Sequence, residues 1–580
     1  MRIKNTESKI FLIKSTILKN SKPITFYLLP FIFYLLFFFF FLNQTSAQQN
    51  FPLNREWGLN RERSNANIPS QLLIDSIKNG VNANPNYASP DNSCFKPFIV
   101  TPSHQVADKS KPLLYRKYRK ESLFIVNDTA DKFYLTLDPL FNFEAGVDAA
   151  DSSGEKLYKN TRGFLLRGDF GKKLSFESSF YETQSAFPQY IDNYIASTGS
   201  VNLGTAIVPG QGRPKLYRTN AYDYSMSSGY ISYSPSSFIN IQLGHGKHFI
   251  GDGYRSLLLS DNSFNYPYAR ITTNYKNFQY TNLYTSFMNI TSGGVATPPN
   301  IEVLYQKKIG NFQMLTANFF RRLTLGLFQG MIWEASDSTN RQHVNFNTFD
   351  PLIGVNTAVY GLHNKNNILL GSTFKLKITN SISFYGQYML DDIYSKGNNI
   401  KLQLKDGYQV GFKYFDVFNV KNLHVQAEYN MVGPYAYAAQ NPSQSYTHYD
   451  QPLAHPLGAN FYEMIGFVNY RLKRFFVELK LNYAVKGIDS SAFNYGSNVF
   501  KSDNIFPANQ NSNSITTTQG VKTTTMYQDF HMGWLVNPST NFNIMFGVSN
   551  RIFVEDKITS YTRYIYIGIR TSLTNFYYDF

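Results

Sequence analysis

Hydrophobic and polar residues alternate at every second position along most of the chain after residue 133. In residues 423–431 the odd positions are apolar and the even positions are polar or charged, and the same period recurs in residues 239–243 and 475–483. A period of two sorts side chains onto the two faces of a β-strand, whereas a helix would scatter them around its circumference. The pattern predicts an all-β fold whose strands have one apolar and one polar face.

The connections between these strands predict a closed barrel, because short and long ones alternate. The short ones lie at residues 171–173, 235–237, 276–277, 379–381, 472–474 and 537–540, and the long ones at about 184–227, 249–268, 290–311, 334–366, 392–406, 433–460 and 485–524. Short periplasmic turns and long extracellular loops are typical of transmembrane barrels, with lipid outside and a wet lumen inside. We therefore predict an antiparallel up-and-down transmembrane β-barrel of about eighteen strands over residues 133–580, with sixteen as the alternative count.

The start of the chain resembles a cleaved secretory signal peptide over residues 1–47. Six basic residues and one acidic residue are followed by an apolar run at 24–42, and Thr45 and Ala47 occupy the −3 and −1 positions of a cleavage site. A membrane anchor is the alternative, since the apolar run could just span a bilayer. With the barrel pattern, the signal peptide predicts export to the cell outer membrane.

Two further segments differ from the barrel pattern. Residues 48–132 are rich in Asn, Ser and Pro, and we expect a periplasmic arm or a partial plug with one short helix near 69–80. At the other end of the chain, Phe576, Tyr578 and Phe580 fall on the opposite phase from the preceding strand. Either a β-bulge or a tail beyond the strand would explain this break.

Composition supports a membrane barrel and limits its partners. The 50 Phe and 43 Tyr residues fit the aromatic girdles of such a barrel. The net charge of +16 becomes +11 without the signal peptide, which suits outer-membrane lipid, lipopolysaccharide or an acidic polysaccharide, or simply keeps long loops soluble. Export argues against a nucleic-acid partner. The single cysteine, Cys94, excludes a disulfide within one chain.

Residues 244–271 are dense in Gly, His and Asp and raise the question of catalysis. Their glycines do not form a dinucleotide or phosphate loop, and no helix pattern follows. Strand parity would place His245 and His248 on opposite faces, which disfavours a metal site. Ser256 and Ser260 lack a nucleophile-elbow context. We therefore predict no catalytic residue, no metal and no cofactor, and hence no enzyme.

The polar residues of two loops remain as candidate inward loop anchors or glycan contacts. The second loop, residues 446–463, combines such residues with Tyr446, Tyr449 and Phe461, which could stack on sugar rings or fold inward to constrict the lumen. The candidates are His245, Lys247, His248, Asp252, Arg255, Asp261, Asn262, His448, His455 and Asn460.

Several motifs resemble the capsule-assembly (Wzi-type) outer-membrane barrels, and more closely their Bacteroidota branch, which includes RemB-like gliding-motility barrel proteins. The glycine-rich segment ending in Ser-Leu-Leu-Leu-Ser carries the resemblance, together with residues 94–98, 137–146, 321–333 and 451–461. Gln329 departs from the pattern, because an acid is expected there. The resemblance implies an eighteen-stranded barrel and a lectin-like role.

The combined hypothesis is a non-enzymatic outer-membrane barrel. Its expected work is attachment or assembly of a capsule or exopolysaccharide, or surface-linked gliding motility with other envelope proteins. The alternative is a porin-like diffusion channel or transporter, which would conduct ions in a planar bilayer, whereas a blocked barrel would not.

Overall fold

The computed structural model describes residues 47–66, 93–102, 104–105, 110–290, 305–320, 322–335, 349–362, 366–395, 402–491, 493–503, 515–571 and 573–580. The expected signal peptide up to residue 46 and the helix expected near 69–80 lie outside these residues. None of the helices in the described ranges is long and apolar enough to span a bilayer.

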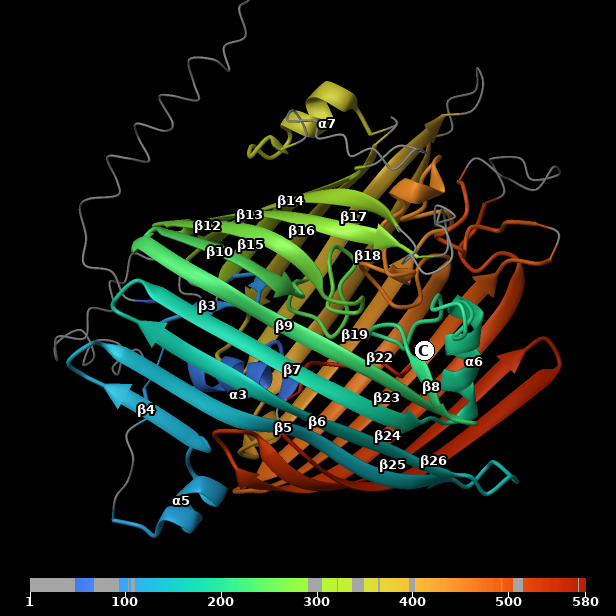
Figure 1. Cartoon of the computed structure of the whole chain (residues 1–580). Helices are drawn as coiled ribbons and strands as arrows, with labels where there is room; N and C mark the ends of the chain where they lie inside the picture. The colour runs from blue at the N-terminus through green and yellow to red at the C-terminus, as the bar shows by residue number, and fades with distance from the viewer. Residues whose placement is uncertain are drawn as a thin grey trace, which may run out of the picture.

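Eighteen antiparallel strands form a closed barrel, which confirms the predicted fold class and strand number (Figure 1). The barrel closes where the last strand pairs with the first, Ile567 lying opposite Ala145. The strands are β5 (Phe133–Asp148), β6 (Lys156–Phe170), β7 (Leu174–Ala186), β9 (Ala221–Ser236), β10 (Ile239–Gly246), β12 (Tyr266–Tyr275), β13 (Phe278–Asn289), β14 (Gln306–Phe319), β15 (Leu323–Glu334), β16 (Asn367–Lys377), β17 (Ile382–Ser395), β18 (Leu402–Phe415), β19 (Leu423–Val432), β22 (Phe461–Leu472), β23 (Phe475–Ile488), β24 (Val521–Asn537), β25 (Phe542–Glu555) and β26 (Ile558–Arg570).

The remaining elements extend the wall, lie on it or fill the barrel. Two short strands extend the wall, β4 beside β5 and β8 beside β9. The short strands are β1 (Gln49–Asn50), β2 (Phe95–Lys96), β3 (Ile99–Val100), β4 (Phe124–Asp128), β8 (Lys215–Arg218), β11 (Phe249–Ile250), β20 (Thr447–His448) and β21 (Gln451–Pro452). The helices are α3 (Arg55–Ala66), α5 (Leu113–Arg119), α6 (Gln189–Thr198), α7 (Val355–Tyr360), η3 (Val417–Asn419) and η4 (Pro442–Gln444).

The two faces of the wall carry the residues that the alternation assigns to them. Leu243, Ile231 and Leu327 point outward and are 62%, 58% and 56% exposed. In β19 the polar positions face inward and are buried, Glu428 at 4% and Asn430 at 0%. An apolar outer face and a polar inner face are the reverse of a soluble fold and suit a barrel in lipid. The inner face is covered by protein, so the expected wet lumen is largely filled.

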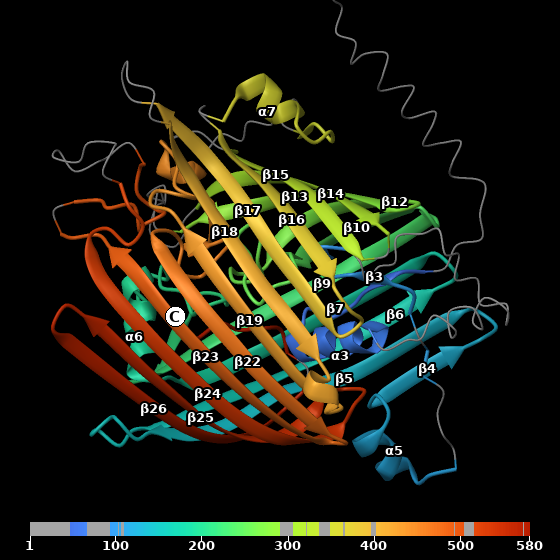
Figure 2. The same ribbon diagram turned by 180° about the vertical axis from the view of Figure 1, so that it is seen from behind.

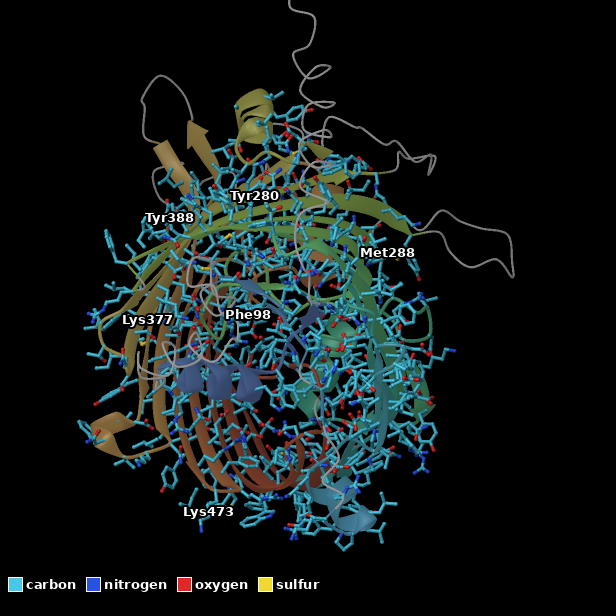
Figure 3. The ribbon with its side chains drawn as sticks, turned by 90° about the vertical axis from the view of Figure 1, so that its left-hand side faces the viewer. Phe98, Tyr280, Met288, Lys377, Tyr388 and Lys473 are labelled. Carbon is cyan, nitrogen blue, oxygen red and sulfur yellow. The ribbon has the colours of Figure 1, made fainter. Side chains whose placement is uncertain are left out.

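The lumen is filled by segments that we call the plug, residues 47–59, 93–100, 247–265, 433–460 and 573–580. Figure 3, which looks along the barrel, shows α3 inside the ring of strands. Residues 249–268 and 433–460 take the inward arrangement, which was one of the two alternatives expected for them. Both connections leave the wall at the end of the barrel that carries the long loops, but then fold back between the strands, because the inner face offers polar partners to their main chains.

The break in phase near the end of the chain is explained by a tail and not by a bulge. β26 ends at Arg570, and residues 573–580 turn into the lumen. There the hydroxyl of Tyr577 donates to Asp261 at 2.7 Å, and Asp579 pairs with Arg255 at 3.0 Å. Phe576, Tyr578 and Phe580 therefore follow no strand periodicity.

Candidate functional site

The plug has an apolar centre made from segments that are distant in sequence. Leu257, Leu258 and Leu259, the middle of the Ser-Leu-Leu-Leu-Ser segment, are fully buried and belong to one cluster with Cys94. Residues 95–96 and 249–250 pair as a small antiparallel sheet inside the barrel. Burial of apolar surface at about 25 cal/mol per Å² makes this centre the main source of cohesion within the plug.

A buried charge cluster joins the plug to the wall. Arg255, only 1% exposed, places Nη2 3.0 Å from Glu463 of β22 and 3.0 Å from Asp579 of the tail. His455 Nε2 lies 2.7 Å from the Glu463 carboxylate, to which Asn482 donates at 2.9 Å. Burial of a charge is costly unless an opposite charge lies close by, and Arg255, Glu463 and Asp579 are paired in this way. The cluster therefore fixes three separate segments to one another.

Inward polar side chains of the strands hold the main chain of the plug. The Glu428 carboxylate accepts hydrogen bonds from the backbone N–H groups of Tyr254, at 2.7 Å, and Arg255, at 3.1 Å. The Gln387 amide accepts from the N–H of Leu257 and donates to the carbonyl of Ile250, both at 2.8 Å. Irregular backbone inside a barrel needs such partners. The inward-facing polar side chains of the strands thus hold the plug in place.

The other candidates in residues 244–271 are also taken up inside the protein. Asp252 pairs with Lys375 of β16 at 2.7 Å. Lys247 donates to the carbonyls of Gly210, at 2.6 Å, and Asp261, at 3.1 Å, and burial lowers its pKa to about 8. The Asn262 amide donates to the carbonyl of Pro452 at 3.2 Å. The Asp252 pair ties the first inward loop to the wall, and the Asn262 contact ties it to the second inward loop.

The second inward loop is locked in the same way. The Asn460 side chain accepts from the N–H of Thr518 at 2.7 Å and donates to the carbonyl of Gly487 at 2.8 Å. The Tyr446 hydroxyl donates to the carbonyl of Leu258 at 2.6 Å. Tyr446 and Phe461 are buried, so these rings do not form an open platform for a sugar.

Nine of the ten candidate residues are buried, and their polar contacts are made within the protein; His245 alone is partly exposed. The structure therefore places the nine among the internal contacts of the plug. Sequence reasoning missed their partners on the strands. The sequence did contain a sign of these partners, because charged residues such as Lys375, Glu428 and Glu463 stand at strand positions whose side chains face the lumen.

His448 is held as a neutral imidazole by its two partners. Its Nδ1 accepts from the backbone N–H of Met288, and its Nε2 donates to the carbonyl of Asn265, both at 3.1 Å. A proton on Nδ1 would face a second donor. Burial, with the nearby cations Lys308 and Lys247, lowers the pKa of His448 to about 3.

Acid is expected to destabilise the plug through His448. Because its folded pKa lies below the ordinary value of about 6.5, its contribution to stability is present above that value and falls as the pH drops toward 3. Between pH 7.5 and 5 we expect a loss of about 2 kcal/mol. Melting curves of the folded barrel at both pH values should show a smaller drop for His448→Gln, which cannot titrate. An equal drop in both proteins would contradict this assignment.

The amino-terminal part of the plug is attached by ion pairs to one side of the wall. Arg55 lies 2.7 Å from Glu478 of β23, and Glu56 lies 2.7 Å from Arg570 of β26. Between these residues, the tail and strands β23–β26, the lumen holds a polar cavity of about 260 Å³. Tyr527 and Tyr566 also line it. A polar cavity of this size is hydrated.

The long-loop end carries an exposed basic and aromatic strand. All four residues of β8 are exposed, with Leu216 at 52% and Tyr217 at 43%. The Arg218 guanidinium lies 5.3 Å from the Tyr217 ring centre. Close by in sequence, Arg213 donates to the Tyr305 hydroxyl at 2.8 Å. Guanidinium groups and flat rings are suited to acidic sugars, which combine a negative charge with an apolar ring face.

No family model and no curated protein matches the sequence. Among solved structures, Wzi of Escherichia coli, described as an outer membrane protein involved in group 1 capsule assembly and a carbohydrate-binding β-barrel, has 14% identity, a TM-score of 0.45, and coverage of 75% of this chain and 85% of that one. OccAB2 of Acinetobacter baumannii has 13% identity, a TM-score of 0.39 and coverage of 76% and 98%. OprD of Pseudomonas aeruginosa has 8% identity, a TM-score of 0.38 and coverage of 80% and 98%. At these identities the likeness is one of architecture.

Proposed function

We propose that this chain is a plugged outer-membrane barrel that attaches or helps to assemble an acidic surface polysaccharide. The observation that carries the proposal is the plug itself. Two inward loops, the tail and the amino-terminal segment fill the lumen and are joined by fully buried ion pairs such as Arg255–Glu463. A wide diffusion path needs an open lumen, so the filled lumen favours a binding role over a porin.

The wall supports the location. An antiparallel barrel closed between β26 and β5, with exposed apolar side chains outside, leaves no unpaired edge and can lie in lipid. Tight turns at one end and long loops at the other favour the periplasm for the first and the cell surface for the second. The basic strand β8 would then face the surface layer.

The proposed binding surface is the exposed part of β8, with Tyr217 and Arg218 as the contact residues. Purified barrel in detergent or nanodiscs should bind a uronic-acid-containing polysaccharide, and the affinity should fall as salt is raised. The variant Tyr217→Ala/Arg218→Ala should bind about tenfold more weakly, a loss of about 1.4 kcal/mol. Lys172→Ala, at an exposed turn at the other end of the barrel, is the matched control.

The same preparation decides between the plugged barrel and a channel. In planar bilayers it should show no steady conductance. Open-channel currents together with unchanged polysaccharide binding in the β8 variant would overturn the proposal. In cells, deletion should release polysaccharide from the surface. A deletion strain that keeps its surface layer but loses movement over surfaces would instead favour a motility role.

A further inference from the structure

The connection between β15 and β16 contains a segment that lies on the outside of the barrel. Residues 349–362, which we call the strap, include α7, and Figures 1 and 2 show this helix outside the wall of strands. Figure 3, seen along the barrel, places it beyond the ring on the same side as Tyr280. The two inward loops fill the lumen; this segment covers the opposite face of the wall.

Beneath the strap, the otherwise apolar outer face of the wall carries polar side chains. Leu283 and Phe287 of β13 belong to the lumen cluster, so the alternate residue Asn282 faces outward. It pairs across the sheet with Gln313 of β14, which pairs with Gln329 of β15. Three amides thus form one cross-strand row, which we call the amide row, near the middle of these strands. Polar groups at this depth are costly in lipid unless they are bonded.

The strap supplies hydrogen-bonding partners for this part of the wall. The Gln313 amide donates to the carbonyl of Asp350 at 2.6 Å. Gln329 accepts from the N–H of Gly354 at 2.8 Å and from the Thr357 hydroxyl at 3.0 Å. As a result Gln313 and Gln329 are each only 1% exposed.

The contacts continue toward the end of the wall that carries the tight turns. The Tyr280 hydroxyl donates to the carbonyl of Pro351 at 2.5 Å and accepts from the N–H of Ile353 at 2.9 Å. Tyr280 is the third residue of β13, counted from the tight turn that precedes it. The strap therefore descends from the long-loop end along much of the height of the wall.

The outer side of the strap is apolar. Its sequence, FDPLIGVNTAVYGL, contains one charged residue, Asp350, whose carboxylate accepts from the N–H of Leu352 at 2.8 Å. Leu352 is 51% exposed and Val359 is 68% exposed. The other exposed positions of the strap are Pro351, Gly354, Ala358 and Gly361. A loop in water would carry polar or charged residues here, and this composition matches the lipid-facing wall beside it, where Leu327 is also exposed.

We infer that the strap is a membrane-embedded segment whose outer side contacts lipid acyl chains. Non-helical backbone is excluded from hydrocarbon because its N–H and C=O groups lack partners there. Here Gln313 and Gln329 of the amide row, together with Tyr280, supply partners to the strap main chain, and the strap shields these two amides from lipid. The strap can therefore lie in hydrocarbon because the wall bonds its main chain, and the wall can carry these polar side chains because the strap covers them. The lipid-facing surface of the barrel then includes the strap.

Cysteine labelling tests the strap position, because the only native cysteine, Cys94, is fully buried. Leu352→Cys and Val359→Cys, carrying a fluorophore, are compared in liposomes with Val410→Cys on the lipid-facing wall and Leu203→Cys in a 78%-exposed loop position. A quencher attached to lipid tails should quench both strap labels at least half as strongly as the Val410 label. Quenching by aqueous iodide at the level of the Leu203 label would overturn the proposal.

A second variant tests the amide row while leaving the strap sequence unchanged. Gln313→Leu/Gln329→Leu removes the side chains that bond the strap, so quenching of the Leu352 label by lipid should fall at least twofold. Ser372→Leu, a similar change on the outer face of β16, should leave it unchanged. Unchanged quenching in the amide-row variant would show that the row does not hold the strap and would contradict the proposal. A correctly folded wall in each variant is confirmed by the Val410 label.

Discussion

Replacement of Arg255 by Met is expected to destabilise the plug by about 3–5 kcal/mol, because Glu463 and Asp579 lose the buried guanidinium that lies 3.0 Å from each. Both acids are at most 1% exposed, so water cannot take its place in the closed plug. The wall should persist, since its strands are joined by backbone hydrogen bonds that Arg255 does not make. The expected result is a closed barrel with a loosened plug.

The buried thiol of Cys94 reports this loosening directly. It lies in the same cluster as the three leucines of the plug and accepts a hydrogen bond from Thr373 at 3.2 Å. Its reaction with a thiol reagent requires local opening, and each 1.4 kcal/mol lost accelerates it about tenfold. Arg255→Met should therefore react at least a hundredfold faster than the unaltered protein, and should show intermittent currents in planar bilayers.

Arg322→Met, an exposed arginine in a turn of the wall, is the control and should react at the original rate. The variant Arg255→Met/Glu463→Gln should recover part of the lost stability, since one of the two acids that lost the guanidinium is then neutral. If Arg255→Met left both the thiol rate and the current unchanged, the charge cluster would not hold the plug.

The wall was predictable from sequence because the hydrophobic pattern that specifies its strands is local. Alternation such as that of residues 423–431 depends on neighbours two positions apart, and turn spacing supplies the strand order. The conformation of the long loops, in contrast, depends on residues that are distant in sequence. Arg255 and Glu463 are separated by 208 positions, and nothing near either residue specifies the other. Turn spacing identifies a long connection, but not whether it projects outward or returns to the lumen.

The strap shows where a sequence signal was present but ambiguous. Asn282, Gln313 and Gln329 are polar on the apolar phase of their strands, which is the kind of local conflict expected at functional or interacting sites. Gln329 was also the position where the family resemblance suggested an acid. In this chain its amide oxygen accepts two hydrogen bonds from the strap, a role for which a neutral side chain is adequate. Only the fold shows that these residues face a segment of the same chain.

Gly371 of β16 is expected to be essential for close packing between the wall and the plug. A Cβ at this position would lie 2.3 Å from Cδ2 of Leu258 and 3.2 Å from its Cδ1. Because Leu258 is fully buried, it cannot move aside freely. Gly371→Ala should therefore cost about 1–3 kcal/mol by overpacking, and Leu258→Ala about 2–5 kcal/mol by leaving a cavity.

The two changes should partly compensate when combined, since the methyl group added by Gly371→Ala points into the space that Leu258→Ala vacates. We expect the double variant to be more stable than the sum of the single costs predicts, with a coupling of about 0.5–3 kcal/mol measured through the Cys94 reaction rate. Gly466→Ala on β22 is the matched control, because a Cβ there meets no atom within 4 Å, and it should be nearly neutral. Strict additivity of Gly371→Ala and Leu258→Ala would show that the plug does not press on the wall at this point, and the wall would then position the plug mainly through polar contacts such as those of Glu428 and Gln387.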